Sequence, residues 1–244
     1  MPRKGRRESG TMFYHVIVKG INNEKIYHQQ REKVYFKKKI LKYLKKYDVE
    51  LYAYCIMSNH AHLIIKAELP VLSAFMAVVL AEYAVYYNFK HRRNGHVFQN
   101  RFVSECIETE AYYWNCLRYI HMNPVKANMV KEPEMDTPGM IHANALIRYK
   151  DNFNDYKQFE TFHKERHLEI FADVREEVMS QKKEAATLIA EQVFEEYPLQ
   201  LFIQVFEEKE VKKVYISRLV KILKISKKEA EKICNAILND IQNR

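Results

Sequence analysis

Residues that interrupt regular structure are scarce in this chain, which has only five glycines and six prolines among 244 residues. Sandwiches, barrels and propellers need many tight turns, so this scarcity excludes them and favours long helices. The four cysteines, Cys55, Cys106, Cys116 and Cys234, form no CxxC pair. We therefore expect reduced thiols of a cytoplasmic protein and predict no structural zinc site.

Long uncharged runs are also missing. No stretch of 18 uncharged residues occurs, and the basic segment 1–10 is not followed by the apolar run of a signal peptide. A soluble protein is therefore expected. Hydrophobic residues make up 48% and aromatic residues 13% of the chain, which excludes a largely disordered protein.

The net charge of +9 is unevenly distributed. Residues 1–131 hold 22 lysines and arginines against 10 acids, residues 132–200 hold 8 against 15, and residues 201–244 hold 10 against 6. Two basic regions thus flank an acidic one. Such a distribution indicates contact with a polyanion such as nucleic acid at both ends of the chain.

Hydrophobic periodicity predicts an alternation of strands and helices in the first half. The expected strands cover 13–19, 51–57, 60–66 and 101–107, and the expected helices cover 30–47, 70–89 and 108–122. The order β-α-β-β-α-β-α is that of an α+β, ferredoxin-like domain with an antiparallel sheet, whose helices we expect on one face.

Beyond residue 131 the composition changes. Residues 132–155 contain two prolines, a glycine and five acids and are predicted to be a linker, and residues 156–244 a helical extension. Within residues 211–241, two helices joined by a turn at Lys224-Ile225-Ser226 are typical of a helix-turn-helix, although the turn lacks the usual glycine. A plain three-helix bundle is the alternative.

Paired histidines are the sharpest local feature of the sequence. His60-Ala61-His62 lies in a predicted strand, where residues i and i+2 point to the same face. Two imidazoles about 6 to 7 Å apart can bind one ion, since the strand rises roughly 3.3 Å per residue. The sequence therefore indicates a candidate metal site.

A tyrosine and an asparagine form the second feature. Tyr119 and Asn123 are four residues apart and share one face of the last predicted helix of the domain, which we expect to end before Pro124. Tyr112 and Tyr113 are rival candidates for a nucleophile, but neither has an asparagine four residues later.

Four ordered blocks make residues 1–131 resemble the single-tyrosine transposases with a His-hydrophobic-His motif, in particular the REP-associated tyrosine transposases. The blocks are Tyr14-His15-Val16 with Lys19-Gly20-Ile21-Asn22, then Ala53 to Leu63, Gly95 to Phe102, and Arg118 to Ala127. The resemblance implies that His60, His62 and Asn123 hold Mg²⁺ or Mn²⁺ and that Tyr119 is the nucleophile. Imidazole ligands favour Mn²⁺, whereas Mg²⁺ ordinarily prefers oxygen.

The implied reaction is cleavage and strand transfer of single-stranded, hairpin-forming DNA through a 5′-phosphotyrosine. Expected phosphate contacts are Lys19, Arg92, Arg93, Arg101 and Lys126, and expected base contacts are Gln99 and Asn100.

Two alternatives remain open. In the first, the protein is a catalytically idle DNA-binding regulator of repeats. In the second, it is a nuclease in which water attacks the phosphate and Tyr119 is only a packing residue. The resemblance also leaves open whether the active site forms within a monomer or across a homodimer. It does not explain residues 132–244, for which contact with duplex DNA is one reading.

Overall fold

The computed structural model describes residues 5–129, 156–171, 173 and 175–242, in two compact units, Met1–Glu165 and Arg166–Arg244. The predicted linker, 132–155, lies outside the described residues. The boundary between the units falls later than the predicted start of the helical extension at 156. Helix α5 (Tyr156–Lys164) belongs to the first unit because Phe159 and His163 are buried against the preceding helix.

The first unit has the predicted order of elements. They are β1 (Phe13–Lys19), the short helix η1 (Ile21–Asn23), α1 (Gln30–Leu44), β2 (Glu50–Ile56), β3 (His60–Lys66), α2 (Leu69–His91), β4 (Val103–Cys106) and α3 (Glu110–Lys126). The sheet order is β2-β3-β1-β4, and all neighbours are antiparallel. This confirms the predicted α+β fold with an antiparallel sheet.

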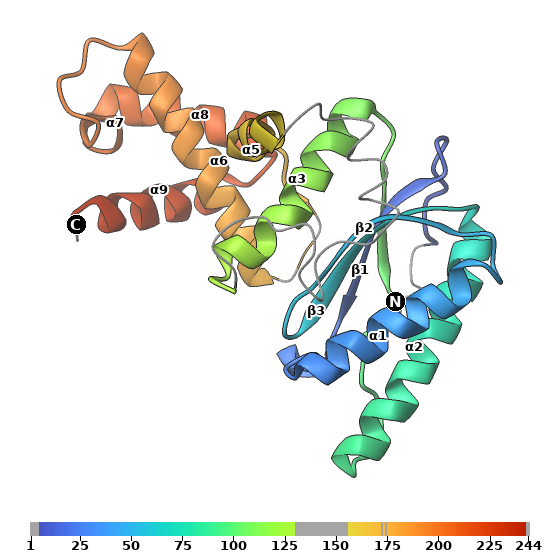
Figure 1. The fold of residues 1–244 in the computed structure, drawn as a ribbon. Helices are drawn as coiled ribbons and strands as arrows, with labels where there is room; N and C mark the ends of the chain where they lie inside the picture. The colour runs from blue at the N-terminus through green and yellow to red at the C-terminus, as the bar shows by residue number, and fades with distance from the viewer. Residues whose placement is uncertain (1–4, 130–155, 172, 174, 243–244) are drawn as a thin grey trace. The chain divides into compact units, whose positions relative to one another are not determined.

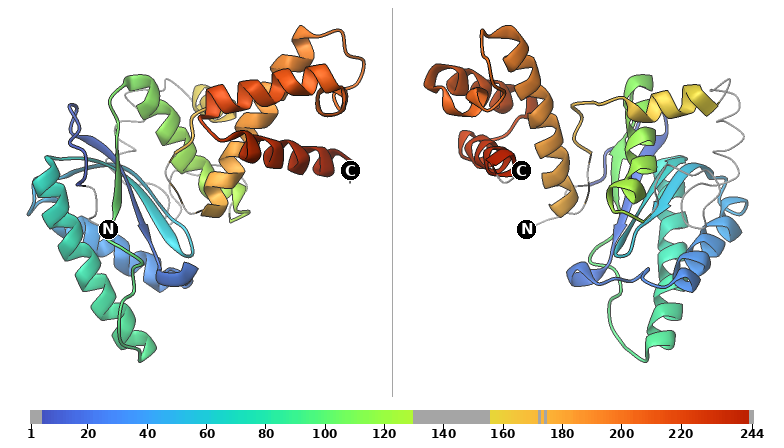
Figure 2. Two further views of the ribbon diagram at one scale, coloured as in Figure 1. Left: turned by 180° about the vertical axis from the view of Figure 1, so that it is seen from behind. Right: turned by 60° about the vertical axis from the view of Figure 1, so that its left-hand side comes forward.

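The helices cover both faces of the sheet, so the expectation of one covered face was wrong. Figures 1 and 2 show α1 and α2 side by side on one face and α3 on the other. Side chains alternate along β1: Tyr14 and Val16 join the core beneath α1 and α2, whereas His15 points to the face covered by α3. The central strands are apolar on both faces, which requires a cover on each.

Helices α1 and α2 are tied together by the buried carboxylate of Glu32. It accepts a hydrogen bond from the backbone N–H of Gln29 at 2.7 Å and contacts Lys90 and His91 at the end of α2. Helix α2 is long and apolar enough by composition to cross a membrane. One side of the helix, including Phe75 and Val79, is fully buried in the core of the unit, as in the core helix of a globular domain.

Helix α3 extends past the point where the sequence predicts its end. Pro124 lies inside the helix, which continues to Lys126. A proline inside a helix removes the hydrogen bond from its own nitrogen to the carbonyl four residues earlier, and its ring crowds that carbonyl, but here the helix ends only two residues later. Asn123 is therefore a helical residue, one turn beyond Tyr119, as a shared face requires.

Turns in the first unit are built largely without glycine. Asn22, Asn23 and Arg92 adopt the left-handed conformation, with φ of 49°, 60° and 49°. Gly20 is required for another reason: a Cβ atom there would lie 2.4 Å from the carbonyl oxygen of Glu24. This close approach lets the turn after β1 pack against the β2–β3 hairpin, where the N–H of Gly20 donates to the Asn59 carbonyl at 2.8 Å.

The second unit is helical in its described residues. It contains α6 (Arg175–Glu196), α7 (Gln204–Glu207), α8 (Lys209–Leu223) and α9 (Lys227–Gln242). Ile189, Val193, Phe206, Tyr215 and Ile233, among others, form its core. Helix α8 begins at Lys209, slightly before the predicted region 211–241, and carries a buried stripe of Val211, Tyr215, Leu219 and Leu223.

Candidate active site

Strand β3 places both histidines of the His-Ala-His motif on the face that α3 covers. The ring centroids of His60 and His62 lie 4.9 Å apart, and both side chains are buried. In the adjacent strand, Lys19 is the register partner of His60. Paired residues of neighbouring strands project to the same face, so the ammonium-bearing side chain lies beside the histidine pair.

The Nδ1 atom of each motif histidine lies within hydrogen-bond distance of a neighbouring side chain. His60 Nδ1 lies 2.7 Å from Asn59 Oδ1, and His62 Nδ1 lies 2.9 Å from His15 Nε2. With Nδ1 carrying the proton of each neutral ring, the lone pair sits on Nε2. Both rings are thus oriented to offer Nε2 to a metal ion, as metal-binding histidines commonly are.

His15 extends this network away from the histidine pair. Its Nδ1 lies 3.2 Å from the Oε2 atom of Glu105 on β4, and the Tyr112 hydroxyl donates to the same oxygen at 3.3 Å. With the Nδ1 proton of His15 directed at the Glu105 carboxylate, the His15 Nε2 atom is left to accept the Nδ1–H of His62. The Glu105 carboxylate therefore fixes the orientation of the His15 ring and determines which of its nitrogens carries the proton.

Helix α3 brings Tyr119 against the histidine pair, and Asn123 lies one turn further along the same helix. The Tyr119 ring contacts that of His62 edge-on, with centroids 5.6 Å apart, and also approaches His15. Asn123 is 3% exposed, and neither its Oδ1 nor its Nδ2 atom has a hydrogen-bond partner among the described residues. A buried amide without partners costs about 1 to 3 kcal/mol, unless another group satisfies it.

These donors fit a divalent metal ion. Two imidazole nitrogens and one amide oxygen form a mixed nitrogen and oxygen set, which suits Mn²⁺ and is acceptable to Mg²⁺ when water completes the shell. The Asn123 amide is buried and has no hydrogen-bond partner, as expected of a ligand whose ion is absent. His60, His62 and Asn123 therefore offer donor atoms of the kinds that such an ion takes.

Helix α5 clamps the back of α3. The Arg118 guanidinium donates to the Phe162 carbonyl at 2.6 Å and to Asn115 at 2.7 Å, and it also contacts Glu165. His121 Nδ1 lies 2.8 Å from His163 Nε2. Burial lowers the pKa of His163 to about 4, so the pair is neutral near pH 7 and shares one hydrogen bond. These contacts set the position of the helix that carries Tyr119.

Removal of the Arg118 side chain should loosen this clamp. Arg118→Ala deletes several charge-assisted hydrogen bonds of a side chain that is 5% exposed, and we expect a loss of about 2 to 4 kcal/mol in the free energy of unfolding. Trp114, the only tryptophan of the chain, packs edge-on against Phe162 of α5 at 5.8 Å, so urea unfolding followed by its fluorescence reports on this junction.

The matched control is Lys157→Ala on the exposed side of α5, expected within about 0.5 kcal/mol of the natural protein. Equal stabilities of the Arg118→Ala and Lys157→Ala proteins would refute the clamp.

The residues predicted to contact DNA are placed at different distances from the histidine pair. Gln99 is close to the histidine pair. Its backbone N–H donates to the Lys19 carbonyl at 2.9 Å, and Lys19 is the register partner of His60. Lys126 lies on α3 along the face of Tyr119 and Asn123, by helical spacing. Asn100 and Arg101, with Gln99, line a cleft of about 470 Å³ between α2 and the loop before β4.

The end of α2 is a separate location. Arg92 is exposed in the left-handed turn after the helix, and the Arg93 guanidinium pairs with Glu24 and donates to the His96 carbonyl at 3.1 Å. Arg93 therefore has a structural role in the loop. The structure does not bring either arginine into contact with the histidine pair.

Sequence reasoning missed His15 and Glu105. His15 stands in one of the blocks that carry the family resemblance, but its link to His62 is diagonal across β1 and β3, since His15 pairs with Ile64 in the register. Only the register reveals that contact. Glu105 and Tyr112, on β4 and α3, join the network for the same reason.

Part of the chain is similar to a family of known proteins. Residues 9–123 match the family model described as "Transposase IS200 like". Among solved structures, the chain is similar to a REP-associated tyrosine transposase bound to a REP hairpin, with 20% identity over 57% of this chain and 82% of that chain, and a TM-score of 0.47.

A second similar structure is that of a candidate transposase from Deinococcus radiodurans, with 18% identity over 49% of this chain and 95% of that chain, and a TM-score of 0.35. No curated protein matches the chain. The family model spans all four strands, both motif histidines, Tyr119 and Asn123. Residues 9–123 are therefore similar to the IS200-like transposase family over the whole of the strand-bearing domain.

Proposed function

We propose that this protein cleaves and transfers single-stranded, hairpin-forming DNA through a covalent bond between Tyr119 and a 5′ phosphate. The observation that carries the proposal is the contact of Tyr119 with His62, together with the buried, unpartnered amide of Asn123 one helical turn beyond Tyr119. A phenol held edge-on against a histidine pair is placed to attack a phosphate bound at that pair.

In the proposed reaction the Tyr119 oxygen forms a bond to phosphorus, and the bond from phosphorus to the 3′ oxygen breaks. The DNA leaves with a free 3′ hydroxyl after that oxygen takes up a proton. Because the phosphotyrosine is a phosphodiester like the bond it replaces, a second 3′ hydroxyl can reverse the step and join strands without ATP. Lys19, beside His60, balances the negative charge of the phosphate.

A divalent ion held by His60, His62 and Asn123 would polarise the scissile phosphate and favour the phenolate of Tyr119, whose usual pKa is about 10. The residues of the chain supply orientation. His15 and Asn59 fix the two imidazoles through Nδ1, and α5 fixes the helix that bears Tyr119.

The experiment that tests this proposal incubates the protein with a 3′-labelled hairpin oligonucleotide and Mn²⁺, with and without chelator, since the label on the 3′ side stays with the protein. The proposed enzyme forms a protein–DNA adduct that survives a denaturing gel, and only without chelator. An idle regulator binds the hairpin equally well in both conditions and never cuts it. A hydrolytic nuclease cuts the hairpin and leaves no adduct.

Loss of the imidazole behind His62 should weaken metal binding. His15→Phe keeps a ring of similar size near Tyr119 but removes the partner of His62 Nδ1, and such changes typically cost about 10- to 100-fold in metal affinity. We expect the Mn²⁺ concentration for half-maximal adduct formation to rise by that factor.

His28→Asn is the control for His15→Phe, because His28 is exposed. An unchanged Mn²⁺ dependence in the His15→Phe protein would contradict a role of His15 in positioning His62.

The proposed partner of the first unit is single-stranded or hairpin DNA in the cytoplasm, with phosphate contacts from Lys19, Arg101 and Lys126 and base contacts from Gln99 and Asn100. We propose that the active site forms within one chain. Tyr119 contacts His62 of its own chain, and α5 holds α3 from behind.

A further inference from the structure

A three-residue turn joins α8 to α9, as in a helix-turn-helix. Helix α8 ends at Leu223, and the next residue, Lys224, takes the left-handed conformation with φ of 52° and ψ of 41°, which usually calls for glycine at this point. Ile225 is buried in the turn, and the Ser226 hydroxyl accepts from the N–H of Glu229 at 3.2 Å and so caps α9. Three residues thus reverse the chain, as in DNA-binding motifs of this type.

Helix α9 is divided into a buried and a polar face. Ala230, Ile233, Cys234 and Ile237 are buried in the core of the unit. The exposed face presents the side chains Lys228, Lys232, Asn235 and Asn239 at helical spacing. These side chains end in hydrogen-bond donors, and asparagine can also accept, which matches the edges of base pairs in a major groove.

Unpaired positive charge surrounds this face. Residues 209–232 contain nine lysines and arginines against three acids. Within the described part of the chain, Lys209, Lys212, Lys221, Lys224, Lys227, Lys228 and Lys232 form no ion pair. Side chains without an internal partner are available to an external one, and their sign calls for a polyanion.

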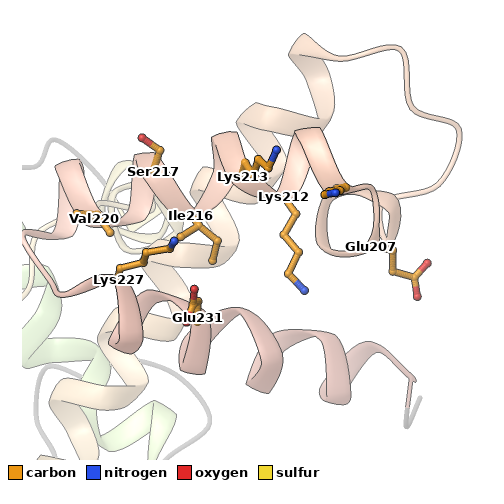
Figure 3. A pocket seen from close by; sticks show the side chains of 9 residues that line it. Glu207, Lys212, Lys213, Ile216, Ser217, Val220, Lys227 and Glu231 are labelled. Atoms are coloured by element: carbon orange, nitrogen blue, oxygen red, sulfur yellow. The ribbon is translucent and has the colours of Figure 1, made fainter.

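A groove of about 650 Å³ separates α8 from the first turns of α9. Figure 3 shows Lys212, Lys227 and Glu231 directed into the space between the two helices, beside Ile216. The exposed lysines are not confined to the groove, since Lys221 and Lys224 lie outside it, next to the turn. A surface that runs over the helix ends and the turn fits the backbone of a duplex better than a single pocket ligand.

We propose that α8, the turn and α9 form a second DNA-binding site that reads duplex DNA, with Asn235 and Lys232 at base edges and lysines 212, 227 and 228 on phosphates. This site is separate from the catalytic residues, so it stands whether or not Tyr119 is a nucleophile. In a transposase domain that acts on hairpins, such a site would add affinity for double-stranded sequence beside the single-stranded segment.

The test uses the full chain carrying Tyr119→Phe in the presence of chelator, so that no cleavage interferes. Excess unlabelled single-stranded DNA occupies the first unit, and fluorescence anisotropy follows binding of a blunt 20-base-pair duplex of random sequence as salt is varied. In the triple variant Lys212→Ala, Lys227→Ala, Lys228→Ala, we expect at least tenfold weaker binding and a salt slope reduced by about 2 to 3.

A charge-matched triple variant, Arg166→Ala, Arg175→Ala, Lys183→Ala, removes the same charge from α6 and the segment before it, where Arg166 is already paired with Glu191 and Lys183 with Asp240. It should retain the natural slope. Circular dichroism of both variants checks that the helices remain folded. Equal losses in the two triple variants, or no loss in either, would overturn the proposal.

Base reading is tested by selecting bound duplexes from a random pool. Asn235→Ala should change or relax the selected sequence at one or two positions without altering the salt slope, because a base contact carries sequence information and a phosphate contact does not. A pool without enrichment, or the same selected sequence in the Asn235→Ala protein, would overturn the assignment of α9 to base edges.

Discussion

Tyr119→Phe is expected to abolish the covalent protein–DNA adduct, a loss of at least about 1,000-fold in the rate of strand cleavage. The substitution removes one oxygen and keeps the ring, which contacts His62 edge-on at a centroid distance of 5.6 Å. Folding, metal binding and hairpin binding should therefore be preserved. The measurement is the rate of adduct formation with a labelled hairpin and Mn²⁺, resolved on a denaturing gel.

Two neighbouring tyrosines of the same helix provide controls. Tyr112 donates to Glu105, and Tyr113 packs edge-on against Phe13 at 5.7 Å, so neither hydroxyl belongs to the histidine pair. The proteins with Tyr112→Phe and Tyr113→Phe should still form the adduct, the first with a modest loss because it weakens the support of His15.

The Tyr119→Phe protein also separates the rival chemistries. Persistence of the adduct in that protein would remove Tyr119 as the nucleophile. Continued cleavage without an adduct would identify water as the attacking group and leave Tyr119 a packing residue.

Replacing both metal-binding histidines should have an effect of similar size. His60→Ala with His62→Ala removes two of the three residues that would hold the ion, leaving only the Asn123 amide, and we expect cleavage to fall at least about 1,000-fold. Hairpin binding in chelator should change by less than about threefold, because the DNA contacts of the unit lie on other residues. Titration of Mn²⁺ into the Tyr119→Phe protein with and without the two histidines measures the loss of metal binding directly.

His28→Ala is the matched control for this pair, since it removes an exposed imidazole and should leave both cleavage and Mn²⁺ binding unchanged. A protein without His60 and His62 that still cleaves at the natural rate would exclude the histidine pair as the metal site. Because the alanines also open space beside Tyr119, His62→Asn serves as a less disruptive second variant with the same expected direction.

The order of the elements could be predicted from the sequence, but the covering of the sheet could not. Alternation in 13–19 and the Ser58-Asn59 turn correctly indicate β1 and the β2–β3 hairpin. Helix α3 covers the face of the sheet that α1 and α2 leave open, and it can do so because both faces of the central strands are apolar. Ile17 and Ile64 on one face and Val16 and Leu63 on the other are all buried, a pattern that in retrospect calls for two covering layers.

The site was foreseeable in part for a similar reason. Histidines at i and i+2 of a strand, and Tyr119 four residues before Asn123, follow from local periodicity alone. The contact of His15 with His62 depends on strand register, and the clamp on Arg118 depends on where α5 packs. Both involve residues distant in sequence, so no local pattern contains them.

The left-handed turns have a consequence for the unfolded chain. Asn22, Arg92 and Lys224 occupy a conformation that is easy for glycine and costs other residues roughly 1 kcal/mol each. A residue with a side chain also has fewer backbone conformations to lose on folding, which returns about 0.4 to 1 kcal/mol relative to glycine. The two effects nearly cancel, so a protein with five glycines can form tight turns with little loss of stability, and its unfolded chain is stiffer than one whose turns depend on glycine.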